Sequence, residues 1–109
     1  MSTEQIESMT PPPEGGPFRD LSAFQRDVLW ILAHNGPSKG LAILEALTHY
    51  YGEGVNHGRL YPNLDELVED GLIDKGQRDR RTNEYRLSKS GEQALGVRFE
   101  WEENGRDNS

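Results

Sequence analysis

The chain has 109 residues, which is the length of a single small domain. It has twelve Lys and Arg against nineteen Asp and Glu, and its net charge is −7. It contains no cysteine, which excludes disulfides, thiolate catalysis, cysteine-based redox sensing and cysteine-ligated zinc. No apolar run approaches the roughly 20 residues of a membrane span, and the first ten residues lack a signal-peptide core, so we expect a cytoplasmic protein without a membrane partner.

The first 18 residues contain PPP and GGP and little that could form a core. We predict a disordered or loosely ordered tail over 1–18, with order beginning near Asp20. Ser22 and Gln25 then have the spacing of a capping box, which predicts the start of a first helix. Asn35-Gly36-Pro37 ends it. Its apolar residues recur at helical spacing: Leu21, Phe24, Val28, Leu29, Ile31 and Leu32.

Two further helices are predicted before the first strand. Ser38 is expected to cap a second helix over GLAILEALTHYY. Asn56 is expected to cap a third, which Gly71 ends. Pro62 lies inside the third segment, so either the regular helix starts near Tyr61 or a continuous helix is bent. We favour the bent helix. Its inward residues would be Leu60, Leu64, Leu67 and Val68.

Two short runs after Gly71 predict a β-hairpin, with Leu72, Ile73 and 75–78 in one strand and 84–87 in the other, joined by a polar turn over 78–83. Ser88 is expected to cap a fourth helix. Residues 97–101 alternate between apolar and charged side chains, which fits a strand, but their spacing also fits a helix. A helix needs no additional turn, and we favour it.

Positive charge gathers in the hairpin. Six cations and two anions lie between Lys75 and Lys89, a local net of +4 in a chain of −7, which leaves −11 for the remainder. A basic patch attracts phosphates, whereas the acidic remainder opposes them. A high-salt cytoplasm would reconcile the two, because the Debye length falls to roughly 3 Å at 1 M salt. Only three of the twelve cations are lysines, which also favours a halophile; the alternative is an ordinary acidic cytosolic protein.

These elements form a mainly α fold with a small β-hairpin, a winged helix-turn-helix with a three-helix core, a wing and a C-terminal helix. We predict a DNA-binding domain over 19–88, a dimerisation helix over 89–103 and a flexible tail over 104–109. A helix followed by a basic-tipped hairpin suits a protein that reads double-stranded DNA. The helix enters a major groove, and the tip reaches the flanking backbone or minor groove.

The motifs resemble those of the PadR-like transcriptional regulators, in particular short archaeal members. Residues 58–64 (GRLYPNL) followed by 67–73 (LVEDGLI) match the family's G-x-L-Y-x-x-L and L-x-x-x-G-L-I core. Arg81, Tyr85, Leu87, Ser88 and Gly91 match its R-x-x-x-Y-x-L-[ST]-x-x-G ending. The resemblance implies a dimeric repressor or activator on a pseudo-palindromic operator, with the third helix in the major groove and the wing beside it.

Each candidate DNA contact has a structural alternative. Arg59 would contact a guanine or only a phosphate, Asn56 would read a base or only cap its helix, and Tyr61 would reach a phosphate or only pack. Ser38 and Lys39 would bind a phosphate at a helix N-terminus. The predicted DNA-binding residues are Ser38, Lys39, Asn56, His57, Arg59, Tyr61, Asn63, Arg78, Arg80, Arg81 and Asn83. Salt ions are expected partners at this interface.

The region after Ser88 is short for the family's C-terminal dimerisation helix, so the N-terminal helix is expected to share a homodimer interface. Phe99 and Trp101 are its aromatic candidates, since an exposed pair of this size is unusual on a monomer; the alternative is that both pack on the domain's own core. The predicted dimer residues are Leu21, Phe24, Leu95, Phe99 and Trp101.

Enzymatic activity is not expected. His34, His49 and His57 lack metal-site spacing, and no nucleophile elbow, phosphate-binding glycine loop or catalytic carboxylate pair is present. We therefore expect no metal and no cofactor. The competing hypothesis is a winged helix that binds protein, or a subunit of a transcription or RNA-handling assembly.

Overall fold

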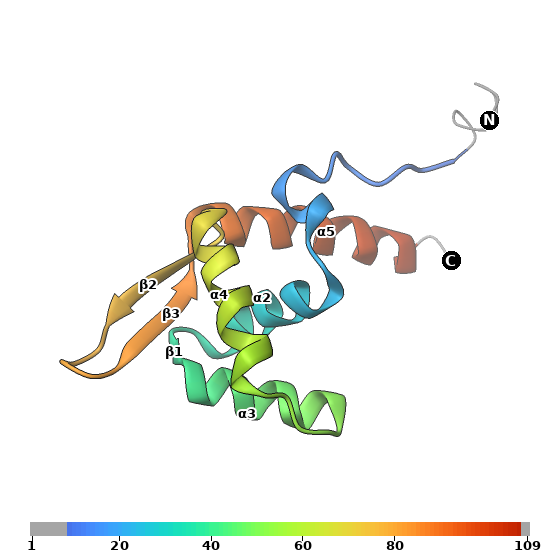
Figure 1. Ribbon diagram of the computed structural model, residues 1–109. Coiled ribbons are helices and arrows are strands. Elements are labelled where there is room, and N and C mark those ends of the chain that lie inside the picture. Colours follow the sequence, from blue (N-terminus) through green and yellow to red (C-terminus); the bar gives the residue numbers. More distant parts are fainter. Residues whose placement is uncertain (1–8, 108–109) are drawn as a thin grey trace.

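The computed structural model describes residues 9–107 and shows a mainly α winged helix-turn-helix (Figure 1). The short 3-10 helix η1 precedes three helices, a wing and the long last helix. In chain order the elements are η1 (Gly16–Asp20), α2 (Ala23–Asn35), β1 (Ser38–Lys39), α3 (Gly40–Tyr51), α4 (His57–Glu69), β2 (Ile73–Gln77), β3 (Asn83–Leu87) and α5 (Lys89–Asp107).

Three of the four predicted helix caps form as expected. Ser22 and Gln25 make both hydrogen bonds of the capping box of α2. The Asn56 side chain accepts from the Arg59 backbone N–H at 2.9 Å, and Ser88 Oγ accepts from the Gly91 N–H at 3.0 Å. These caps satisfy backbone donors that have no partner within their helices.

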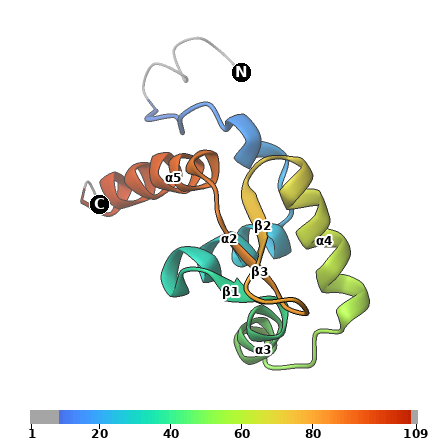
Figure 2. The same cartoon turned by 90° about the vertical axis from the view of Figure 1, so that its left-hand side faces the viewer.

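The predicted cap of α3 is wrong. Its N-cap residue is Lys39, and the hydroxyl of Ser38 donates to the Gly36 carbonyl oxygen at 2.9 Å. Ser38 is instead held in strand β1, opposite Tyr85 of β3. The sheet therefore has three antiparallel strands in the order β1-β3-β2, and β1 joins the start of α3 to the middle of β3 (Figure 2).

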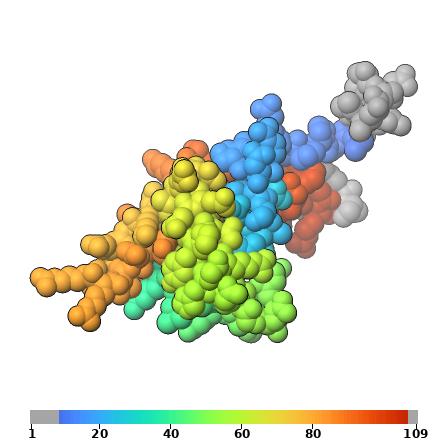
Figure 3. All heavy atoms as spheres, viewed as in Figure 1, coloured from blue at the N-terminus to red at the C-terminus, as the bar shows by residue number. Residues whose placement is uncertain are grey.

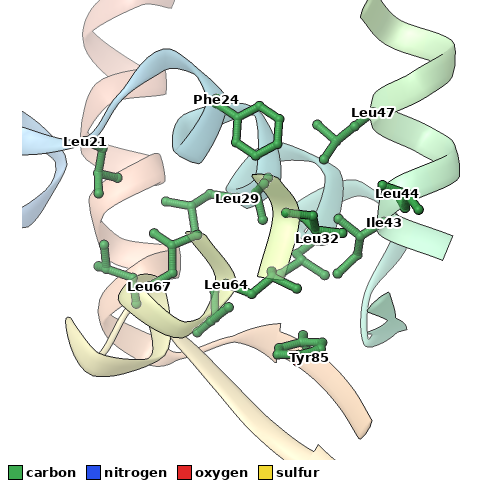
Figure 4. Packing of buried hydrophobic residues seen from close by; sticks show 14 of the residues in the cluster. Leu21, Phe24, Leu29, Leu32, Ile43, Leu44, Leu47, Leu64, Leu67 and Tyr85 are labelled. Atoms are coloured by element: carbon green, nitrogen blue, oxygen red, sulfur yellow. The ribbon is translucent and has the colours of Figure 1, made fainter. Parts of the chain in front are cut away.

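The core lies between the helices and the inner face of this sheet (Figure 4). Leu29 of α2, Leu47 of α3 and Leu64 of α4 are each fully buried, and Tyr85 closes the cluster from the sheet with 1% of its surface exposed. Burying side chains of this size contributes about 1.5–3 kcal/mol each relative to exposure. This packing fixes α4 against the base of the wing.

Ordered structure begins earlier than the predicted end of the tail at residue 18. Residues 16–20 form η1, and Phe18 is buried under the Arg26 guanidinium, whose carbon lies 4.5 Å from the ring centroid. Arg26 also donates to the Phe18 carbonyl oxygen at 3.0 Å. The part of the tail prediction that covers residues 1–8 lies outside the described residues.

The two open questions about helices have clear answers. Helix α4 starts at His57 and contains Pro62, so the helix is continuous and does not start near Tyr61. Residues 97–101 belong to α5, which confirms the helical interpretation. Because α5 continues to Asp107, residues 104–107 are helical and do not form part of a flexible tail; residues 108–109 lie outside the described residues.

Candidate nucleic-acid interface

The tip of the wing is a turn held by one carboxylate. Asp79 Oδ1 accepts from the backbone N–H groups of Arg81 at 2.9 Å and Thr82 at 3.0 Å. The first of these hydrogen bonds is the main cause that lowers the pKa of Asp79, and the positive charge of Lys39 adds to it. The ionised Asp79 thus gives the turn a fixed shape, and Lys39 is close enough to act on it electrostatically.

The three arginines of the turn are not equivalent. Arg78 is paired with Glu84 across the hairpin, with its Nε 2.6 Å from Glu84 Oε2. The side chains of Arg80 and Arg81 have no partner among residues 9–107. Figure 3 shows the hairpin projecting from the body of the molecule. Free cations on a projecting turn suit contact with a phosphate backbone.

One side of α4 is tethered to the rest of the protein. The guanidinium carbon of Arg59 lies 4.1 Å from the centroid of the Phe24 ring and 5.8 Å from that of Tyr51. Asn63 donates to the Arg59 carbonyl oxygen at 2.7 Å and accepts from Gln25 Nε2 at 3.1 Å. Arg59 and Asn63, which were predicted to contact DNA, make these contacts within the protein. Arg59 is also exposed, and its guanidinium makes no hydrogen bond within residues 9–107.

Gln25 is the centre of this tether. Among the described residues, Gln25 is the polar residue that is buried, with 8% of its surface exposed. Its Oε1 accepts from the Ser22 N–H, and its Nε2 donates both to Asn63 and to Glu66 Oε2, the latter at 2.8 Å. All hydrogen-bonding groups of its amide are therefore used in joining α2 to α4.

The other side of α4 faces the sheet and the start of α3. The rings of His57 and Tyr61 stack with centroids 5.6 Å apart and planes 7° from parallel. Tyr61 packs on Gly40, where a Cβ atom would lie 2.5 Å from its hydroxyl oxygen, so a larger residue at position 40 would displace the Tyr61 ring. Asp65, one turn further, is exposed, and its charge acts on Tyr85 of β3.

The remaining predicted DNA contacts lie around this side. Lys39 is exposed at the N-cap of α3 next to the wing, and Asn83 is exposed at the start of β3, opposite Gln77. Asn56 caps α4, and its side-chain oxygen is used in doing so. Ser38 is half-buried in β1. The structure thus groups Lys39, His57 and Tyr61 with the wing. Asp65, which was not predicted, joins them.

Three of the five predicted dimer residues belong to the core of the protomer. Leu21, Phe24 and Leu95 have 8%, 5% and 3% of their surfaces exposed, so they are not available to a second copy. Trp101 is half-buried beneath the Arg98 guanidinium. Phe99, by contrast, is 51% exposed and meets the edge of Trp30, a residue of α2 that was not predicted.

Residues 9–107 contain no group of three or more His, Cys, Asp or Glu side chains placed to hold a metal ion. Within the same range, every helix is too short or too polar to cross a bilayer.

Comparison with known proteins agrees with this fold. The model of the transcriptional regulator PadR-like family matches residues 28–97. The chain is 53% identical in sequence to hsRosR in a complex structure, with a TM-score of 0.73. The match covers 76% of this chain and 73% of the hsRosR chain. RosR of the halophilic archaeon H. salinarum, from crystals grown from NaBr, is also 53% identical, with a TM-score of 0.72 and coverage of 76% and 74%.

A more distant structure has the same fold. Rv1404 from Mycobacterium tuberculosis is 21% identical, with a TM-score of 0.75, and covers 84% of this chain and 60% of that one. No curated protein matches the chain.

Proposed function

Because the chain belongs to the PadR-like family of transcriptional regulators, whose members bind DNA, we propose that it acts as a cytoplasmic homodimer on a pseudo-palindromic operator. In each half-site α4 lies in the major groove, and the β2–β3 wing contacts the flanking backbone or minor groove. The observation that carries this proposal is the pair of arginines at the tip of the wing that follows α4, Arg80 and Arg81, whose side chains have no partner within residues 9–107.

The wing contributes mainly through charge. Arg80 and Arg81 project from a turn that Asp79 holds in shape, and Lys39 lies near enough to extend the basic surface to α3. Arg78 contributes less, because Glu84 neutralises it. These groups contact phosphates and fix the position of the protein on the duplex, but they carry no sequence information directly.

The proposed dimer contact is the exposed apolar surface shared by α2 and α5, formed by Trp30 and Phe99. These side chains are 37% and 51% exposed, their rings are in contact, and they belong to two helices that pack together. Contiguous aromatic surface of this kind is rarely left exposed on a soluble monomer. A second copy of the same surface would cover it around a two-fold axis.

Salt ions are proposed partners of the complex. The protein outside the wing is strongly acidic, and a relative that is 53% identical comes from a halophilic archaeon. Cations taken up between acidic side chains and phosphates would offset the counterion release that normally weakens binding as salt rises. We expect a shallow or reversed dependence of affinity on salt in the molar range; a steep negative slope there would contradict it.

The test of DNA binding reverses charge at the tip. In the variant Arg80→Glu plus Arg81→Glu, affinity for all duplexes should fall, whatever their sequence, in a fluorescence anisotropy titration. The matched control is Arg19→Glu plus Arg106→Glu, which changes the net charge equally in η1 and at the end of α5. If the tip variant and the control bind duplexes alike, the wing does not contact DNA and a protein-binding role is favoured instead.

The dimer is tested separately by its mass in concentrated salt. Phe99→Glu places a charge in the proposed contact and should yield a monomer by sedimentation. Leu41→Glu, a change of the same kind at a residue of α3 that is 56% exposed, should leave the mass unchanged. A wild-type protein that is itself monomeric would overturn the dimer proposal.

A further inference from the structure

Some side chains of α4 are held in contacts toward α2, and others are not. Arg59, Asn63 and Glu66 are held by Phe24, Gln25 and one another on the side toward α2. These contacts restrict the positions of their side chains. The other side of the helix carries residues that have no such contacts to α2.

That other side carries one continuous stripe. His57, Tyr61 and Asp65 are spaced four residues apart, which places them along the same side of a helix with 3.6 residues per turn. His57 is stacked on Tyr61, and Tyr61 is seated on Gly40, so both rings are positioned by packing. Asp65 completes the stripe, and its carboxylate has no hydrogen-bond or ion-pair partner in the described part of the chain.

A carboxylate on this side has a specific consequence for DNA. When α4 lies in the major groove, the carboxylate is close to the phosphates of the DNA, and repulsion lowers the affinity for every duplex. It can add to the affinity only where a base offers it a hydrogen-bond donor. In the major groove the base donors are the amino groups of cytosine and adenine, while guanine and thymine present acceptors that repel a carboxylate.

Cytosine fits better than adenine. The adenine amino group lies next to the N7 acceptor, which an ionised carboxylate approaches unfavourably, whereas the cytosine amino group has only a C–H group beside it. We infer that Asp65 is a specificity-determining residue that accepts a hydrogen bond from the N4 amino group of a cytosine in each half-site. It selects by rejecting other bases as well as by binding the correct one.

This inference rests on the proposed function and is tested on the full-length protein. Duplexes are selected from a randomised pool, and affinities are measured for the selected sequence and its single-base variants. The wild-type protein should prefer cytosine at one position of each half-site by roughly tenfold. Glu100→Gln, which removes the same charge from an exposed position of α5, should show an identical preference.

Two substitutions at Asp65 give distinct results. Asp65→Asn should move the preference at that position from cytosine to adenine, because an asparagine amide pairs with the N6 and N7 groups of adenine. Asp65→Ala should abolish the preference and strengthen binding to random DNA. A merely structural role would not exchange one base for another.

The outcomes also separate the inference from the proposed function. If the wild-type protein selects a sequence and both Asp65 variants keep its preference at every position, Asp65 reads no base, and the proposed function stands. If the wild-type protein binds no duplex, both proposals fail together.

Discussion

The guanidinium of Arg59 lies over the ring of Phe24, with its central carbon 4.1 Å from the ring centroid. The Phe24 ring is in turn stacked with that of Tyr51, their centroids 6.1 Å apart. The first turn of α4 is thereby joined to both α2 and α3. A cation over an aromatic ring contributes about 0.5–2 kcal/mol to stability. Arg59 therefore helps to hold α4 against α2.

We expect Arg59→Ala to lower the free energy of unfolding by about 1 kcal/mol. Arg59→Lys should lose part of that amount, because an ammonium group lacks the flat face that stacks on a ring. Urea denaturation of both variants measures the difference. Their base preference in a selection from random duplexes should match that of the wild-type protein; relaxation at one operator position would show that Arg59 leaves Phe24 and reads a base.

Gln25 should matter more for stability than any other polar residue of α2. Gln25→Met keeps the side-chain volume but removes the hydrogen bonds to Ser22, Asn63 and Glu66. We expect a loss of about 1–3 kcal/mol in the free energy of unfolding, because partly buried partners are left unsatisfied. Gln93→Met, at an exposed position of α5, is the matched control and should change little. Equal effects would mean that the tether to α4 is weak.

The local part of the fold was predictable from sequence. Caps such as Ser22, Asn56 and Ser88 act on residues three positions away, so their spacing is visible in the chain. Ser38 was predicted wrongly because its role is set by Tyr85, a partner 47 positions later. Phe18 was assigned to the tail for a similar reason, since its burial depends on Arg26.

The candidate interface was predictable only as a region. The arginines of the wing are visible as a local excess of charge, but only the structure shows that Glu84 neutralises Arg78. An apolar stripe likewise does not distinguish a core residue such as Leu95 from an exposed one such as Phe99. The spacing of His57, Tyr61 and Asp65 is present in the sequence, but an acidic residue gives no signal of DNA contact in a search for positive charge.

Two glycines of α5 should respond oppositely to the same substitution. At Gly91 a Cβ atom would lie 2.2 Å from the Leu72 carbonyl oxygen, so Gly91→Ala forces the helix away from the wing. We expect a loss of about 1–3 kcal/mol in the free energy of unfolding. At Gly96 a Cβ atom meets open space, and Gly96→Ala should stabilise the protein by about 0.5–1 kcal/mol. Urea denaturation measures both, and a neutral Gly91→Ala would show that the contact is readily relieved.

Alkaline pH should unfold the protein partly through Tyr51. Its hydroxyl donates to Asp27 Oδ2 at 2.5 Å, and burial, followed by this carboxylate, raises the pKa of Tyr51 from 10.0 to about 12. Because the folded protein holds the neutral phenol more strongly than the unfolded chain does, the contribution to stability is complete below pH 10. It is lost as pH rises from 10 toward 12.

Tyr51→Phe should therefore make the free energy of unfolding less dependent on pH across that interval. It should also remove a titration step near pH 12 from the ultraviolet absorbance of tyrosinate. Burial also raises the pKa of Tyr85, so some dependence on pH should remain in the variant. Tyr50→Phe, at a residue that is 68% exposed, is the control and should preserve the steep alkaline loss of the wild-type protein. If Tyr51→Phe and Tyr50→Phe give the same pH profile, the phenol of Tyr51 ionises freely in the folded state, and its hydrogen bond to Asp27 contributes nothing to alkaline stability.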